Sequence, residues 1–270
     1  MLQRCCNAPS LLFVTQSNTP ISSTVHYEQE PVKNVPIESS IYYMLPKSMP
    51  YQRQQLARCA VVGNGGILHN SRCGSEIDAM EFVFRCNLPP VSAEFAKDVG
   101  SKTDIVTINP SIIIDRYDSL MQRHGPFLAR IRSYGNASLL LPAFFGGRSM
   151  ELALRARYVL DEAGSSRPLY FFHPIYLAHV GAFWRRHGVQ ERRSSSGLLV
   201  ASAALELCRE VHLYGFWPFS QDVDGAHLSH HYYDDQRPRP GIHVMPIENF
   251  HFLQLHSKGI LRVHTQRCSN

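Results

Sequence analysis

From Cys59 onward, short apolar runs alternate with longer segments that we predict to be helices. We expect strands over the apolar runs Cys59–Val62, Glu81–Cys86, Asp104–Ile108, Ser138–Leu141, Leu169–Phe172 and Val211–Tyr214. We expect helices over Ser119–Ser133, Met150–Glu162, Ile175–His187, Gly197–Arg209 and Pro246–Lys258. Strands that are apolar along their whole length are typical of a sheet covered on both faces. The alternation therefore predicts an α/β fold, with a mostly parallel sheet flanked by helices.

Residues 1–50 differ from this pattern, because they are rich in Ser, Pro, Asn and Thr and show little periodicity. Such a composition predicts a poorly ordered linker or stalk. The remaining residues, 51–270, are enough to form one domain with a full core, since 44% of the chain is hydrophobic.

Charge and cysteine usage narrow the class of protein. The net charge is +5 and the basic residues are scattered, apart from Arg185-Arg186 and Arg192-Arg193, so we expect no nucleic-acid partner. The seven cysteines lack the paired short spacings of a zinc site, and their wide separation suits disulfides formed in an oxidising compartment. Asn136 begins an N-glycosylation sequon, which points the same way. No apolar run is long enough to span a membrane, and we identify no signal peptide.

The first candidate site is the turn Gly63–Gly66, which follows the first buried strand. Glycines without a Cβ let a ligand approach the backbone, as in a nucleotide or phosphate cradle at the carboxyl end of a sheet. Leu68 stands where a dinucleotide fingerprint has its third glycine, which argues against NAD. The alternative is a tight turn that binds no ligand.

Two more segments have both a functional and a structural interpretation. Arg192–Gly197 leads into an apolar helix, where its serines can bind an anion or simply cap the helix. Tyr214–Phe219 places aromatic residues after a strand, where they can stack on a base or sugar or belong to the core.

Histidines cluster between residues 227 and 243, at His227, His230, His231 and His243. Imidazoles are suited to proton transfer near neutral pH. Zinc binding is the competing interpretation, but this stretch offers no obvious third ligand.

Taken together and in this order, the segments resemble the sialyl motifs of the animal sialyltransferases, in particular the α-2,8 branch. The four motifs correspond to Cys59–Val106, Arg193–Phe216, the HYYD sequence at His231–Asp234, and His243–Glu248. Within the branch, Arg239–Pro246 and Leu255–Thr265 are most similar to the type V subgroup, followed by types VI and I.

The resemblance implies a Rossmann-like, GT-A-like fold that transfers sialic acid from CMP-sialic acid, with inversion and without a metal, to the 8-hydroxyl of a terminal sialic acid. It implies that His243 is the catalytic base and that His231 faces the departing phosphate. The implied donor contacts are Asn64, Asn87, Ser195, Ser196, Gly197 and Trp217, with Asn109 near the donor or acceptor sugar. The chain departs from the family at Ser196, which is usually Thr, and at Ser194, which is usually Leu. Glu248 either orients His243 or merely begins a helix.

The resemblance also implies two disulfides, Cys59–Cys208 and Cys73–Cys268, and a buried free thiol at Cys86; it assigns no partner to Cys5 or Cys6. It further implies a Golgi-lumen enzyme, with a membrane anchor that is not in this chain. Its acceptor would be a glycolipid or glycoprotein glycan, and it can form a homodimer. The competing functions are a non-catalytic sialoglycan-binding protein, a nucleotide-sugar hydrolase and a metal-dependent hydrolase.

Overall fold

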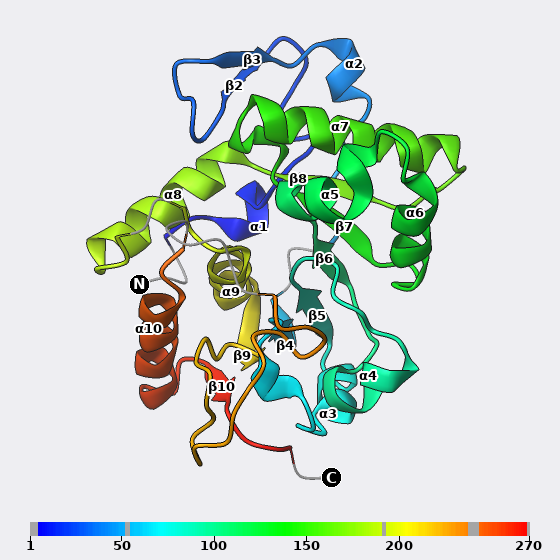
Figure 1. The fold of residues 1–270 in the computed structure, drawn as a ribbon. Coiled ribbons are helices and arrows are strands. Elements are labelled where there is room, and N and C mark those ends of the chain that lie inside the picture. Colours follow the sequence, from blue (N-terminus) through cyan, green and yellow to red (C-terminus); the bar gives the residue numbers. More distant parts are fainter. Residues whose placement is uncertain (1–4, 52–54, 191–192, 237–242, 269–270) are drawn as a thin grey trace.

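The computed structural model describes residues 5–51, 55–190, 193–236 and 243–268, and these form a mostly parallel sheet flanked by helices (Figure 1). Within the described residues, the main sheet has the strand order β1-β8-β7-β6-β5-β4-β9-β10. Its strands are β1 (Phe13–Val14), β4 (Leu56–Val62), β5 (Phe82–Arg85), β6 (Ile105–Thr107), β7 (Ser138–Leu141), β8 (Leu169–Phe172), β9 (Cys208–Tyr214) and β10 (Arg262–His264). All the pairings are parallel except that of β1 with β8. The predicted α/β fold class is confirmed.

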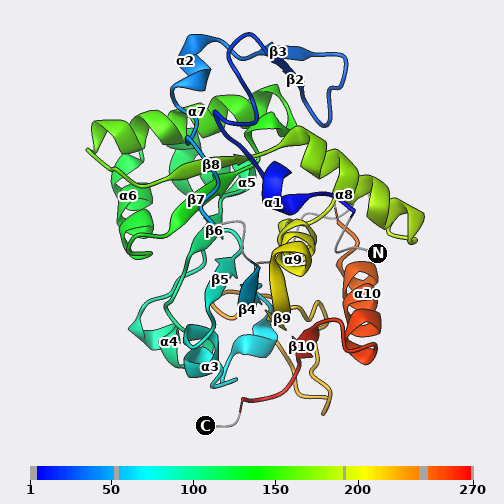
Figure 2. The ribbon, with the colours of Figure 1, turned by 180° about the vertical axis from the view of Figure 1, so that it is seen from behind.

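Helices cover both faces of the sheet (Figures 1 and 2). One face carries α1 (Ala8–Leu11), α8 (Pro174–Arg186), α9 (Ser196–Leu207) and α10 (Met245–Ser257). The other carries α3 (Gly74–Asp78), α4 (Ala93–Val99), α5 (Pro110–Tyr117), α6 (His124–Arg132) and α7 (Gly147–Glu162). Successive residues of β4 alternate between the two cores, as the twofold period of a strand requires: Val61 faces the first, while Ala60 and Val62 face the second. No helix among these residues is both long and apolar enough to cross a bilayer.

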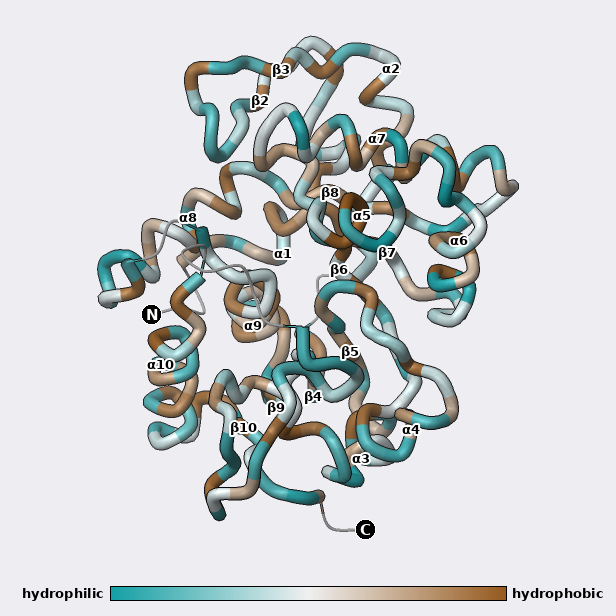
Figure 3. Tube along the Cα trace, in the orientation of Figure 1, coloured by the Kyte–Doolittle hydropathy of each residue, from teal (hydrophilic) through white to brown (hydrophobic). Residues whose placement is uncertain are grey.

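The central helix α9 is buried on all sides from Leu198 to Leu207. Figure 3 shows its apolar residues in the middle of the molecule. A helix that is apolar all round has to lie inside the protein, so its N-terminus at Ser196 is held in a fixed position against the sheet.

Two predicted helices differ from the structure at their ends. The segment predicted as helix from Ser119 begins as a short 3-10 turn (Asp118–Leu120), and α6 starts only at His124. Asp118, Ser119 and Leu120 have φ values of 50°, 53° and 57°, which a right-handed helix cannot contain. The helix predicted to reach Arg209 ends at Leu207, because the chain becomes extended at Cys208 and begins β9.

The structure differs from the prediction that residues 1–50 form a poorly ordered linker. Leu12 and Phe13 are buried, and β1 extends the main sheet by pairing with β8. The carboxylate of Glu206 accepts the N–H of Ala8 at 3.1 Å. Beyond β1 lie the hairpin strands β2 (Thr24–His26) and β3 (Asn34–Pro36) and the short helix α2 (Ser39–Tyr42). These elements are too short to show a hydrophobic period, which is why the sequence pattern missed them.

The structure joins Cys59 to Cys208 and Cys73 to Cys268, as the family resemblance implies. It also pairs Cys5 with Cys6, which the sequence left unassigned. Cys86 is a buried free cysteine, and burial raises the pKa of its thiol to about 12. The thiol is therefore inert at neutral pH.

The order of the strands makes the boundary between β4 and β9 a topological switch point. The chain continues from β4 to β5 on one side, and from β9 toward β10 on the other. Open α/β sheets commonly bind ligands at the carboxyl ends of the strands at such a point.

Candidate active site

The loops that follow β4 and β9 are in close backbone contact. The N–H of Gly63 donates to the carbonyl of Tyr214 at 2.8 Å, and the N–H of Gly65 donates to that of Gly215 at 3.0 Å. A Cβ on Gly65 would lie 2.7 Å from the Gly215 oxygen, and one on Gly66 would lie 2.0 Å from the Ser229 oxygen. The glycines are thus required by neighbouring protein backbone, and the prediction that they admit a ligand to the backbone is replaced by this packing role.

Asn64 lies between these glycines and presents an unused acceptor. Its side-chain Nδ2 donates to the carbonyl of Cys86 at 3.0 Å, and its own carbonyl accepts the N–H of Tyr232 at 2.9 Å. Its Oδ1 is buried and has no hydrogen-bond partner within the described part of the chain. A buried polar atom without a partner is costly, so it marks a position where a ligand donor would fit.

Asn87, Asn109 and Ser196 form a chain of hydrogen bonds at the ends of β5, β6 and α9. The Asn87 side-chain oxygen accepts the N–H of Asn109 at 3.2 Å. The side-chain oxygen of Asn109 in turn accepts the Ser196 hydroxyl at 2.8 Å. Three residues that the resemblance assigns to the site are therefore adjacent, although 109 positions separate the first from the last.

Ser195 has a different role from the one implied for it. It is buried, and its hydroxyl caps α9 by accepting the N–H of Leu198 at 3.0 Å. The Ser195 hydroxyl and N–H both donate to the carboxylate of Glu248, in the first turn of α10. Ser195 is thus used within the protein, and Glu248 lies in the first turn of α10 and holds the loop before α9.

His243 lies against the same loop. Its Nδ1 is 2.6 Å from the carbonyl oxygen of Arg193. A carbonyl can only accept, so Nδ1 carries the proton and Nε2 of the neutral ring has a free lone pair. This is the tautomer that a general base needs.

His231 is held by a carboxylate. Its Nδ1 lies 2.6 Å from Oδ1 of Asp234, whose Oδ2 lies 3.1 Å from the guanidinium of Arg116. Burial alone would raise the pKa of Asp234, but the hydrogen bond from His231, with the nearby Arg116, lowers it. The Tyr233 ring stacks on the imidazole with centroids 5.1 Å apart. An antiparallel bridge between Gly65 and His231 joins this segment to the loop after β4.

Phe216 and Trp217 follow β9, and the sequence left open whether such aromatic residues belong to the core or contact a ligand. Phe216 packs edge-on against Phe252 with centroids 5.3 Å apart, and a Cβ on Gly197 would lie 2.8 Å from its ring. Trp217 is only half-buried, and its Nε1 donates to the carbonyl of Gln221 at 2.7 Å. Phe216 therefore belongs to the core, while the ring of Trp217 can contact a ligand.

The sequence did not identify the roles of Asp234 and Asn249. Asp234 lies three residues after His231 in the same short motif, and that spacing was the available signal. Asn249 is buried and donates to the carbonyl of Phe216 at 2.6 Å, a contact that no sequence pattern indicates.

Zinc binding by the histidines between 227 and 243 finds no support in the described part of this segment. Elsewhere among the described residues, three ligand atoms come together at Glu76, His212 and His264; a second group contains Cys5 and Cys6, whose sulfurs are joined in a disulfide. Residues 237–242 of the segment lie outside the described residues.

Comparison with known families decides which of the sequence interpretations holds. Residues 13–260 match the family described as glycosyltransferase family 29 (sialyltransferase). The chain belongs to this family.

Curated members of the family cover almost the whole chain. Over 268 residues it is 54% identical to alpha-2,8-sialyltransferase 8E of Mus musculus, which covers 99% of this chain, and the chain covers 65% of that protein. It is 48% identical to alpha-2,8-sialyltransferase 8F of the same species, with 99% and 67% coverage. It is 42% identical to an alpha-N-acetylneuraminide alpha-2,8-sialyltransferase of Xenopus tropicalis, with 99% and 77% coverage. The predicted family and branch are confirmed, with 8E and 8F relatives as the resemblance implied.

A solved family member has the same fold. A mammalian sialyltransferase in complex with Gal-beta-1-3GalNAc-ortho-nitrophenol aligns with a TM-score of 0.54 and 27% identity. The alignment covers 78% of this chain and 70% of the other.

Proposed function

We propose that this sialyltransferase-family chain transfers sialic acid from CMP-sialic acid to the 8-hydroxyl of a terminal sialic acid, with inversion at the anomeric carbon. The observation that carries the proposal is the tautomer of His243, whose Nδ1 donates to Arg193 and whose Nε2 is left as a base. The alpha-2,8-sialyltransferase names of the relatives support the acceptor hydroxyl.

The donor binds at the carboxyl ends of β4 and β9. The free Oδ1 of Asn64 accepts a hydrogen bond from the donor, and Asn87 lies at the neighbouring strand end. The first N–H groups of α9, at Ser196 and Gly197, have no acceptor within the helix and favour an anion such as the donor carboxylate or phosphate. The half-buried ring of Trp217 packs beside the nucleotide.

The reaction separates charge, because negative charge grows on the departing phosphate while the acceptor hydroxyl loses its proton. Nε2 of His243 takes this proton as the hydroxyl attacks the anomeric carbon and the bond to the phosphate oxygen breaks. His231, which Asp234 holds through Nδ1, presents its ring to the departing phosphate. This chemistry needs no metal.

The decisive experiment is to incubate the folded, oxidised protein with CMP-sialic acid and a panel of sialylated glycans, and to determine the new linkage by mass spectrometry. We expect an α-2,8 linkage on at least one acceptor that ends in sialic acid. Nucleotide binding without transfer to any acceptor would favour a sialoglycan-binding protein, and release of free sialic acid alone would favour a hydrolase.

Replacing His231 by glutamine should lower kcat by roughly 10²-fold, because a donor aimed at developing charge is typically worth that much. The affinity for CMP should change far less. His227→Ala is the matched control, because His227 is an exposed histidine in the same segment. Equal kcat values for His231→Gln and His227→Ala would contradict the assigned role.

The acceptor carries a carboxylate. A small cavity beside the loop before α9, against which His243 lies, offers this carboxylate a cation. The cavity is lined by Arg185, Arg193 and Glu28, among others, and the Arg193 guanidinium lies 3.7 Å from the centre of the Phe145 ring. Burial lowers the pKa of Arg193 and raises that of Glu28, because both charges are poorly solvated here. A further charged group is therefore favoured in this cavity only when it pairs with the Arg193 guanidinium.

Arg193→Met should therefore lower kcat/KM for the sialylated acceptor by about tenfold, the loss of one charge-assisted hydrogen bond. The KM for the donor should be unchanged, since the backbone carbonyl that holds His243 remains. Arg186→Met, on the exposed end of α8, is the control. A larger effect on the donor KM than on the acceptor would refute the assignment.

The setting that we propose is the Golgi lumen, where the long-range disulfides are stable. Asn136 is exposed in the turn before β7 and is accessible for glycosylation there. The acceptor is a glycolipid or glycoprotein glycan, and a homodimer is compatible with this function.

A further inference from the structure

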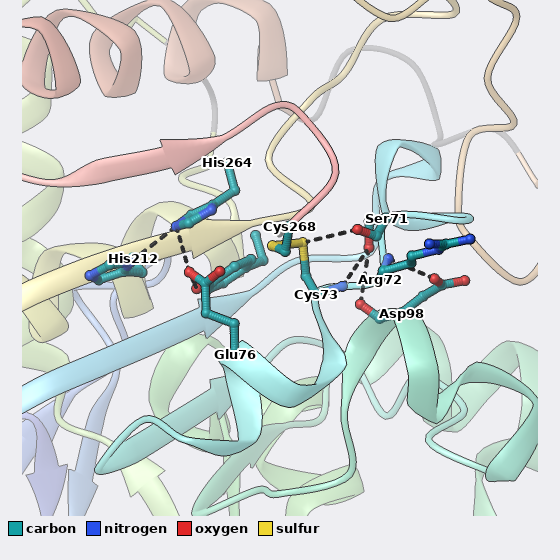
Figure 4. The surroundings of a disulfide bond; sticks show 9 residues. Ser71, Arg72, Cys73, Glu76, Asp98, His212, His264 and Cys268 are labelled. Carbon is teal, nitrogen blue, oxygen red and sulfur yellow. Dashed lines mark hydrogen bonds and ion pairs between the residues drawn. A yellow bond between two sulfur atoms is a disulfide. The ribbon is translucent and has the colours of Figure 1, made fainter. Parts of the chain in front are cut away.

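Three metal-ligating side chains meet on the face of the sheet that α3 covers, outside the loops that carry His231 and His243. They are Glu76 of α3, His212 of β9 and His264 of β10 (Figure 4). Strand β10 runs parallel to β9 with Arg262 opposite His212 and His264 opposite Tyr214. This register places His212 and His264 on one face of the sheet, and α3 covers that face.

The separations between the ligand atoms suit a small cation. Nδ1 of His212 lies 3.0 Å from Nε2 of His264, and that nitrogen lies 3.6 Å from Oε1 of Glu76. Ligands about 2.0–2.1 Å from a tetrahedral zinc ion lie about 3.3–3.4 Å from one another. The observed values fall on either side of this spacing, and all three ligand atoms lie within 4.8 Å of one another, so the side chains have to shift only locally to centre an ion.

The protonation state of the histidines also suits a metal. Burial lowers the pKa of His264 to about 4 and lowers that of His212, so both rings are neutral at pH 7. Metal ligation requires the neutral imidazole. The side chains of His212 and His264 are 13% and 12% exposed, while that of Glu76 is 36% exposed and leaves a path from solvent.

Neighbouring groups hold the ligands in place and set the local charge. The hydroxyl of Tyr214 donates to Oε1 of Glu76 at 2.6 Å, and its ring stacks on His264 with centroids 4.1 Å apart. Oε2 of Glu210 lies 4.0 Å from Nε2 of His212, on the side away from His264. At this distance Glu210 makes no hydrogen bond to the ring, and it adds negative charge beside the cluster.

The positive groups that face this cluster are Arg58 and Arg262. They oppose a cation and partly offset the two carboxylates. The site is therefore expected to bind zinc reversibly and not as a permanent structural ion.

We propose that Glu76, His212 and His264 bind a divalent transition-metal ion, Zn²⁺ by preference, with water at the fourth position. Two histidines and one carboxylate are a common zinc ligand set. The ion cross-links α3 to β10, next to the disulfide that joins Cys73 to Cys268 across the same two segments. Its role is to stabilise the C-terminal segment, and it takes no part in sugar transfer.

The test is a Zn²⁺ titration of the oxidised protein against a chromogenic chelator, without donor or acceptor. We expect the wild type to bind one ion, and His264→Ala and His212→Ala each to bind at least tenfold more weakly. His227→Ala should bind as the wild type does, because it removes an exposed histidine outside the cluster. Zn²⁺ should also raise the melting temperature of the wild type but not that of His264→Ala.

Glu76→Gln provides a second variant if a histidine substitution prevents folding, because it keeps the size of the side chain and an acceptor for Tyr214. It should also weaken Zn²⁺ binding at least tenfold. Absence of binding by the wild type, or wild-type affinity in Glu76→Gln and His264→Ala, would overturn the proposal. The titration involves no transfer reaction, so its failure would leave the proposed sialyltransferase activity untouched.

Discussion

Replacing His243 by alanine should lower kcat by about 10²- to 10⁴-fold, the usual contribution of a positioned general base. The imidazole is attached to the loop before α9 through Arg193, and that loop is attached to α10 through Ser195 and Glu248. The proposed base is therefore held in place before the acceptor arrives, and this positioning is what such catalysis depends on. Steady-state kinetics with saturating CMP-sialic acid measures the effect.

Two further measurements separate catalysis from folding in His243→Ala. Its affinity for CMP, measured by calorimetry, should stay close to that of the wild type, because the proposed donor contacts come from the ends of β4, β5 and α9. His227→Ala should retain normal turnover, since His227 is exposed and lies outside the proposed site. Normal turnover by a folded His243→Ala protein would exclude His243 as the base.

Removing the Cys59–Cys208 disulfide, by changing both residues to serine, should lower the free energy of unfolding by about 2–5 kcal/mol. The bond joins residues 149 apart in sequence, and a cross-link restricts the unfolded chain most when it closes a long loop. It also ties the two strands, β4 and β9, whose carboxyl ends carry the proposed donor site. A melting temperature lower by roughly 5–15 °C is the expected result.

Cys86→Ala is the matched control for this double variant. It removes a buried cysteine at the same sheet but breaks no cross-link. Its cost should be that of a small cavity, well below the loss from the disulfide. If the two proteins melt at the same temperature, the disulfide does not stabilise the fold in the way argued here.

Much of the fold could be predicted from local patterns. The strands β4 to β9 were identified as short apolar runs, because a strand that is buried on both faces is apolar at successive positions. Helices α7 to α10 were identified because each exceeds three turns. The short elements β1, β10 and α3 were missed, since two to five residues show no period and are stabilised by pairing and packing.

For the site, the sequence by itself determined the family and the residue types, because four short motifs in order are specific even when each one is ambiguous. Only the tertiary structure decided what each side chain does. It hydrogen-bonds Ser195 to Glu248, sets the tautomer of His243 through the Arg193 carbonyl, and places His264 beside His212 and Glu76. These pairs lie between 50 and 188 residues apart in the chain. Hydrogen bonds over such separations depend on how strands and helices pack, and no local pattern of residues records that packing.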